Sequence, residues 1–88
     1  MLGDEEHKMI KVKLFAMLKE FTKRDELLLE WPEAVSCESV LSYLEKEYEI
    51  PESILKRCLV ARNGEYAQRD SCLSAGDELA VLPPVSGG

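Results

Sequence analysis

The last residues of the chain carry the simplest chemistry that the sequence offers. After Pro83 and Pro84 the sequence ends Val-Ser-Gly-Gly, which places the backbone carboxylate of Gly88 last. Because glycine has no Cβ, Gly87 and Gly88 can pass through a channel too narrow for other residues and present that carboxylate to an enzyme. Small, polar chain ends are also common without any function, so the glycine pair alone is a weak signal.

The chain has few other groups suited to catalysis. Its three cysteines, Cys37, Cys58 and Cys72, are widely spaced and form no C-x-x-C motif, so we predict neither a disulfide framework nor a redox pair. We expect buried thiols at Cys37 and Cys58, since free cysteine behaves as a small hydrophobic residue, and an exposed thiol at Cys72. The single histidine, His7, lies in a polar N-terminal stretch, which leaves a zinc site or a Cys–His nucleophile pair incomplete. We therefore predict no metal site and no catalysis by this chain alone.

Composition and charge indicate one small globular domain with few classes of partner. The chain has 88 residues, of which 45% are hydrophobic and 32% charged, as expected for a single domain. We expect an N-terminal extension over residues 1–8, a domain over residues 9–84 and a flexible tail over residues 85–88. Eleven Lys and Arg against seventeen Asp and Glu give a net charge of -6, which disfavours binding to nucleic acid or to anionic lipid.

The hydropathy pattern contains no membrane or export signal. Apolar runs stay well short of the roughly 18 residues of a membrane span, and the first residues lack the basic and apolar regions of a signal peptide. The expected location is therefore the cytosol.

Apolar residues at every second position predict the first strand, with lysines between them. These apolar positions are Ile10, Val12, Leu14 and Ala16. Phe15 falls on the lysine face of this strand. After a connector, Leu27 to Trp31 predict a second strand that ends at Pro32 and pairs with the first as a hairpin.

The next segment has the spacing of an amphipathic helix. Ser36 can cap it, and one apolar stripe recurs at helical intervals: Cys37, Val40, Leu41, Leu44 and Tyr48. A short second helix is predicted from Pro51 to Leu55. Asn63-Gly64 then predicts a tight hairpin turn between two strands, because both of its positions need positive φ. A last strand covers residues 78–82.

This order of elements predicts an α+β fold with two packed layers. A first hairpin, one main helix that crosses over, and a final strand returning beside the first form the β-grasp, or ubiquitin-like, arrangement. We expect a mixed sheet of about five strands covered by one helix, with the first and last strands parallel in the middle of the sheet.

Three segments of the chain resemble the small subunit of molybdopterin synthase. They are F-A-M-L-K-E at Phe15–Glu20, A-R-N-G-E-Y at Ala61–Tyr66 and G-D-E-L-A-V-L-P-P-V-S-G-G at Gly76–Gly88. The resemblance runs from about Met9 to Gly88. The C-terminal segment is the most specific, because other ubiquitin-like proteins share Gly-Gly but generally not the residues before it. Arg62 departs from the family, which usually has an apolar residue before Asn-Gly.

The resemblance implies a chemical role for Gly88. A ubiquitin-activating-like adenylyltransferase would adenylate its carboxylate with ATP, and sulfur would then replace AMP to give a thiocarboxylate. The tail residues Pro83, Pro84, Val85, Ser86 and Gly87 would enter the large subunit of the synthase. There the thiocarboxylate would donate sulfur to cyclic pyranopterin monophosphate in molybdenum cofactor biosynthesis. The resemblance also implies a heterotetramer of two small and two large subunits, and no cofactor bound by this chain itself.

The alternation of the last strand predicts where a partner would dock. If Leu79 and Val81 face the helix, their neighbours face outward on the other side of the sheet. The expected partner surface comprises Phe15, Tyr66, Ala80 and Leu82.

Two other kinds of function stay open at the level of the sequence. A ubiquitin-like protein modifier would join Gly88 to lysine side chains through an isopeptide bond, and an interaction module would have an inert tail. Sulfur carriers of thiamine or tungsten-cofactor pathways are further alternatives.

Overall fold

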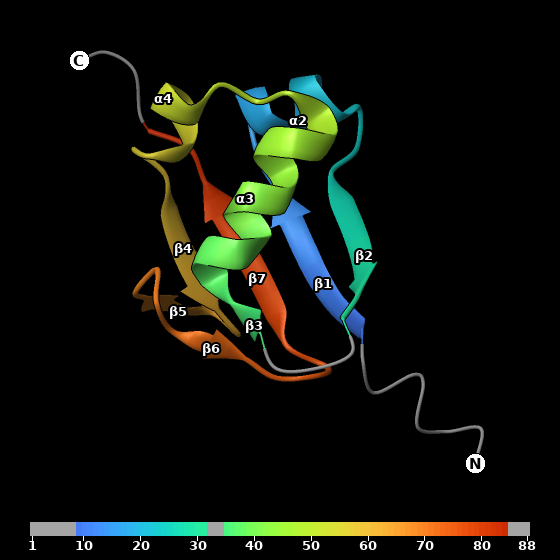
Figure 1. Cartoon of the computed structure of the whole chain (residues 1–88), viewed down its shortest axis with the longest axis vertical. Helices are drawn as coiled ribbons and strands as arrows, with labels where there is room; N and C mark the ends of the chain where they lie inside the picture. Colours follow the sequence, from blue (N-terminus) through green and yellow to red (C-terminus); the bar gives the residue numbers. More distant parts are fainter. Residues whose placement is uncertain (1–8, 32–34, 85–88) are drawn as a thin grey trace.

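The computed structural model describes residues 9–31 and 35–84. They form a mixed sheet with one long helix across one face (Figure 1). The predicted N-terminal extension, residues 1–8, and the predicted tail, residues 85–88, lie outside the described residues.

The centre of the sheet is a parallel pair of strands from the two ends of the chain. The strand order is β2-β1-β7-β4-β5, and β1 (Met9–Leu14) runs parallel to β7 (Glu78–Leu82). The edge strand β2 (Glu26–Glu30) is antiparallel to β1. This confirms the predicted β-grasp arrangement, with the first and last strands side by side in the middle of the sheet.

The other strands form a hairpin and a separate short pair. β4 (Leu59–Arg62) is antiparallel to both β7 and β5 (Glu65–Ala67). The turn between β4 and β5 has φ of 50° at Asn63 and 91° at Gly64, so the predicted Asn-Gly turn is confirmed. A two-stranded sheet of β3 (Val35–Ser36) and β6 (Cys72–Leu73) was not predicted from the sequence.

The main helix begins and ends close to where the sequence predicted. α3 (Cys37–Tyr48) is capped by Ser36, whose hydroxyl oxygen accepts a hydrogen bond from the Ser39 N–H at 3.2 Å. The cap satisfies one of the free N–H groups of the first turn. The short helix α4 (Glu52–Leu55) follows Pro51, as expected. The sequence predicted only a connector where the structure has α2 (Met17–Thr22).

The structure corrects the expectation for the two residues after β1. Phe15 lies just beyond the end of the strand, and Ala16, which alternation placed toward the core, is exposed. Ala16 has φ of 51°, a conformation that cannot continue a strand. The chain therefore turns into α2, where the Leu18 N–H donates to the Phe15 carbonyl at 3.0 Å. Leu18, with 0% exposure, occupies the core position instead.

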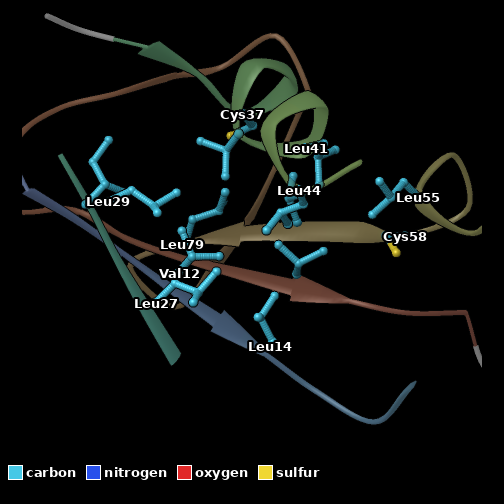
Figure 2. Packing of buried hydrophobic residues seen from close by; sticks show 14 of the residues in the cluster. Val12, Leu14, Leu27, Leu29, Cys37, Leu41, Leu44, Leu55, Cys58 and Leu79 are labelled. Atoms are coloured by element: carbon cyan, nitrogen blue, oxygen red, sulfur yellow. The ribbon is translucent and has the colours of Figure 1, made fainter. Parts of the chain in front are cut away.

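The core lies between the sheet and the helices. Figure 2 shows side chains of β1, β2 and β7 on one side, among them Val12, Leu27 and Leu79, with Leu41 and Leu44 of α3 above them. Leu79 and Val81 are both 0% exposed, which confirms the predicted alternation of β7. Each such side chain stabilises the fold by about 1.5–3 kcal/mol through burial of apolar surface.

Asp77 fixes the β4–β5 hairpin to the start of β7. Its carboxylate accepts hydrogen bonds from Arg62 Nε at 2.8 Å, Asn63 Nδ2 at 3.1 Å and the Ser74 N–H at 2.7 Å. Burial acts to raise the pKa of Asp77, but these three donors outweigh burial and hold the pKa below its ordinary value. The ionised carboxylate is thus part of the folded structure.

Candidate functional site

The candidate site is an apolar surface on the face of the sheet opposite α3. It comprises the following residues, which we call the outer-face patch: Phe15, Leu59, Ala61, Tyr66, Ala80 and Leu82. In β4 and β7 the patch residues alternate with the buried Val60, Leu79 and Val81, so their side chains point away from the core. Tyr66 lies on the same face because it pairs with Ala61.

Strand pairing brings the members of the outer-face patch together in two rows. In the first row, Ala80 pairs with Lys13 on one side and with Ala61 on the other, and Ala61 pairs with Tyr66. In the second row, Leu82 pairs with Leu59. Paired residues on one face of a sheet lie within about 4.5–5.5 Å of each other at Cβ, so each row forms a continuous surface.

Phe15 lies at the end of the second row. It directly follows Leu14, which pairs with Val81, the residue before Leu82. Because β1 and β7 are parallel, Phe15 and Leu82 lie at the same end of the sheet. Tyr66, Ala80 and Leu82 therefore lie on one face, as predicted. Phe15, the fourth predicted interface residue, is exposed in the turn after β1, at the Leu82 end of the sheet.

The exposure of the patch is high for residues of this type. Phe15 is 41% exposed, Leu59 58% and Tyr66 76%, while Ala80 and Leu82 are half-buried. Contiguous apolar surface of this kind is typical of interaction sites. Leu59 and Ala61 were not predicted from the sequence, although they flank Val60, and the alternation of the strand indicates that both face outward.

Charged residues occupy the other end of the same face. Lys13 Nζ lies 3.9 Å from Glu78 Oε2, and Lys11 Nζ lies 3.7 Å from Glu26 Oε2. The outer face is therefore apolar where β7 ends and charged where β7 begins. A partner that covers the patch would find a polar rim on this side, as protein interfaces commonly have.

The outer-face patch lies where the C-terminal segment leaves the sheet. β7 ends at Leu82, and Pro83 and Pro84, both half-buried, are the last described residues. The predicted tail residues Val85, Ser86, Gly87 and Gly88 lie outside the described residues. A protein bound to the patch would thus also meet the chain just before its Gly-Gly sequence.

The cysteines have the predicted exposure. Cys37 and Cys58 are buried and Cys72 is exposed. Burial raises the pKa of both the Cys37 and the Cys58 thiols, so at neutral pH they are protonated and weakly nucleophilic.

Within residues 9–31 and 35–84, no cluster of three or more His, Cys, Asp and Glu side chains is arranged to hold a metal ion. In the same part of the chain, the helices are too short or too polar to cross a membrane. The described residues form a ubiquitin-like fold with an apolar surface beside the C-terminal strand.

Comparison with known proteins agrees with this class. The model of the ThiS family matches residues 12–88. The molybdopterin synthase sulfur carrier subunit of Chlamydomonas reinhardtii is 35% identical over 81 residues, which cover 90% of this chain and 98% of that protein. The chain belongs to the ThiS family.

Two solved structures extend the comparison. Small archaeal modifier protein 1 from Haloferax volcanii is 30% identical, with a TM-score of 0.77 over 91% of this chain and 99% of the other. A complex of subunits 1 and 2 of the molybdopterin-converting factor from Helicobacter pylori contains a chain with a TM-score of 0.62 and 23% identity, covering 91% of this chain and 99% of that one. The second likeness is one of fold.

Proposed function

We propose that this chain is the sulfur-carrier subunit of a molybdopterin synthase. The observation that carries the proposal is its 35% identity to a molybdopterin synthase sulfur carrier subunit over nearly the whole of that protein. The geometry supports it, because the outer-face patch offers a docking surface beside the strand that leads to Gly87 and Gly88.

The proposed reaction takes place at the carboxylate of Gly88. A carboxylate is a poor electrophile, so it first attacks the α-phosphorus of ATP to form an acyl-adenylate and releases pyrophosphate. A sulfur donor then attacks the acyl carbon, AMP leaves, and a thiocarboxylate remains. Like a thiolate, this group is largely ionised and nucleophilic at neutral pH, which suits it to attack cyclic pyranopterin monophosphate.

The catalytic groups of this reaction belong to the partners. We propose that an adenylyltransferase supplies the ATP site, and that the large synthase subunit supplies the pterin site. The solved complex of subunits 1 and 2 from Helicobacter pylori supports an assembly of this kind. We further propose that two small and two large subunits form the synthase and that it acts in the cytosol.

The large subunit is expected to cover the outer-face patch. Aromatic side chains such as Phe15 and Tyr66 are enriched among the residues that contribute most to binding. With the patch covered, the segment after Pro84 would be directed into the partner, where two glycines fit a narrow channel.

A mass measurement tests the proposal. The full chain is incubated with the adenylyltransferase of its own source, ATP and a sulfide donor, and its intact mass is measured. We expect a gain equal to the mass difference between sulfur and oxygen, dependent on ATP, followed by molybdopterin formation when large subunit and precursor are added. A chain that stays at its original mass in the presence of an active adenylyltransferase refutes the proposal.

The likeness to small archaeal modifier protein 1 supports a second candidate function, protein modification. The chemistry is the same up to the acyl-adenylate, but a lysine amine rather than sulfur finally displaces the activated group. The same incubation with a cell extract added separates the two, because conjugation to extract proteins gives adducts of much higher mass, while sulfur transfer leaves the chain free.

A further inference from the structure

The edge strand β2 has a row of backbone groups without partners in the sheet. β2 is the last strand on one side of the sheet, with β1 as its only neighbour among the described residues (Figure 1). An edge of this kind can accept another strand unless it is protected.

The hydrogen bonds of β1 show which groups of β2 point outward. The Lys11 N–H donates to the Asp77 carbonyl at 3.1 Å, on the β7 side, whereas the Leu14 N–H donates to the Asp25 carbonyl at 3.0 Å, on the β2 side. The backbone N–H and C=O groups of successive residues in a strand point alternately to its two neighbours. The groups of Ile10 and Val12 therefore point toward β2, like those of Leu14.

The pairing register then assigns the groups of β2. Leu29 pairs with Ile10 and Leu27 with Val12, so these two leucines exchange hydrogen bonds with β1. The N–H and C=O groups of Glu26, Leu28 and Glu30 point the other way. Within residues 9–31 and 35–84, none of these groups makes a hydrogen bond to a turn, loop or other strand.

A groove runs alongside this edge, between β2 and α3. It has a volume of about 510 Å³ and combines charged and apolar lining residues, which are Arg24, Asp25, Glu26, Leu27, Leu28, Leu29, Tyr43 and Tyr48. The ring of Tyr43 packs edge-on against Trp31, with centroids 6.0 Å apart and planes at 70°, which holds it in place. Leu28 lines the groove at the strand edge, but its side chain alternates with the buried Leu27 and Leu29, points to the other face of the sheet and is 60% exposed.

We propose that β2 binds an extended segment of another protein, which adds to the sheet as a sixth strand and carries lysine or arginine at its ends. Its backbone would pair with Glu26, Leu28 and Glu30. Alternate side chains would then enter the groove beside Tyr43 and Tyr48, while the others would lie beside Leu28. The surface is distinct from the outer-face patch, so it is a second docking site beyond the proposed sulfur transfer.

The charges around the edge select a basic partner. Glu26 and Glu30 end the strand on both sides, and Asp25 lies at its start. Glu47 follows Tyr43 by four residues in α3, so it lies on the same side of the helix, near the groove. Arg24 lines the groove, Lys11 pairs with Glu26, and Lys13, opposite Glu26 in the register, pairs with Glu78. These residues together carry five carboxylates against three cations.

The same charges disfavour a second copy of this chain as the occupant. The strand reads Glu-Leu-Leu-Leu-Glu, so an antiparallel pair centred on Leu28 would place Glu26 opposite Glu30 of the second copy at both ends. Like charges directly opposite each other destabilise a sheet.

The test uses a labelled peptide and the full chain. The probe is Lys-Val-Thr-Val-Thr-Val-Lys, which alternates as a strand and is basic at both ends, titrated to about 1 mM, near the weak end of useful affinities. We expect amide chemical-shift changes in an NMR spectrum at Glu26, Leu28 and Glu30, and weaker binding at high salt. The same peptide flanked by Glu instead of Lys is expected to bind less.

Two variants and a matched control sharpen the test. Leu28→Pro removes an N–H that β1 does not use, so we expect it to fold, as its spectrum would verify, and to bind at least 10-fold more weakly. Glu30→Lys is an exposed charge reversal that keeps the backbone, and we expect about 2–5-fold weaker binding of the Lys-flanked peptide and tighter binding of the Glu-flanked one. Glu65→Lys makes the same change on the other edge strand, β5, and is expected to alter neither.

Three results would overturn the proposal. The first is an absence of shifts at the β2 amides. The second is a set of shifts confined to the outer-face patch. The third is a concentration-dependent shift of the β2 amides without peptide, which would show that a second copy occupies the edge.

Discussion

At the scale of single residues, Asp77 offers the clearest test of what holds the sheet end together. In Asp77→Asn an amide NH₂ would face the donors of Arg62, Asn63 and Ser74, so at least one hydrogen bond would be lost. We expect the free energy of unfolding to fall by about 1–3 kcal/mol at pH 7, measured by urea denaturation. Asp70→Asn, at an exposed carboxylate, is the control and is expected to change little.

The contribution of Asp77 to the free energy of unfolding depends on pH, and its lowered pKa determines the direction of this dependence. The pKa of Asp77 in the folded chain is below its ordinary value of 3.8, so the unfolded chain binds the proton more readily. The stabilisation is therefore fully present above the ordinary pKa and is lost as the pH falls through the lower, folded-state pKa. The difference between Asp77→Asn and the unchanged chain should shrink below about pH 4; an equal difference at pH 7 and at acidic pH would contradict this account.

At the scale of elements, the face to which a strand residue points determines whether the position tolerates a charge. In β7, Val81 is 0% exposed in the core whereas the next residue, Leu82, belongs to the outer-face patch. Val81→Asp buries an unpaired carboxylate, so we expect a loss above about 4 kcal/mol and an unfolded chain by circular dichroism. Leu82→Asp and Phe15→Asp should stay folded and lose binding to the large subunit and to the adenylyltransferase. Unfolding of Phe15→Asp to the same degree as Val81→Asp would show that Phe15 is needed by the core.

A second prediction at this scale concerns the end of α3. Glu49 follows the helix with φ of 57° and ψ of 37°, a left-handed conformation that costs most L-residues about 1–2 kcal/mol. Glycine adopts it freely, and its entropy cost offsets only part of the gain, so Glu49→Gly should stabilise the chain by about 0.5–1 kcal/mol. Glu47→Gly, within the helix, is the control and should destabilise it by about 1 kcal/mol. If the thermal midpoints of Glu49→Gly and Glu47→Gly moved in the same direction, this interpretation would be wrong.

Elements with a strong local pattern could be predicted from the sequence, and those made by distant contacts could not. The stripe from Cys37 to Leu44 and the Asn63-Gly64 turn are local signals, and the structure confirms both. β3 and β6 have two residues each and pair with one another although they are far apart in the sequence, Val35 with Leu73 and Ser36 with Cys72. Strands this short have no local periodicity that could predict them. α2 has six residues, too few for a helical period, and it breaks the strand alternation at Ala16.

For the candidate site, the sequence predicted which face of β7 is exposed but only part of the surface around it. Ala80 and Leu82 follow from alternation alone. Leu59 joins them only through the register of β4 against β7, which depends on the whole sheet. The groove beside β2 depends in the same way on where α3 packs, because Tyr43 and Tyr48 are distant from β2 in the sequence.

At the scale of the whole molecule, the structure separates folding from the proposed chemistry. The buried core runs from Ile10 to Val81 and includes residues of every strand of the main sheet except β5. The proposed reactive group, the carboxylate of Gly88, is seven residues beyond the last core residue, Val81. Changes at the end of the chain should therefore affect sulfur transfer without affecting stability.

Deletion of Gly88 tests this separation directly. It moves the terminal carboxylate back by one residue, about 3.3–3.6 Å, whereas a misplacement of about 1 Å already slows a positioned reaction by about 10²-fold. We expect loss of thiocarboxylate formation and of molybdopterin synthesis, with an unchanged midpoint of urea denaturation. Gly87→Phe should give the same loss for a different reason, since a bulky side chain would block the channel that the glycines are proposed to enter.

Binding to the large subunit distinguishes the two variants from a damaged docking surface. Both keep Phe15, Tyr66 and Leu82, so the truncated chain should still bind the large subunit and compete with the unchanged carrier. Leu82→Asp, by contrast, keeps the terminal glycines and any thiocarboxylate already formed on them. It should nevertheless fail to compete with the unchanged carrier for the large subunit. Normal molybdopterin formation by the chain that lacks Gly88 would remove the basis for the sulfur-carrier function, because no other group in the chain is proposed to carry the sulfur.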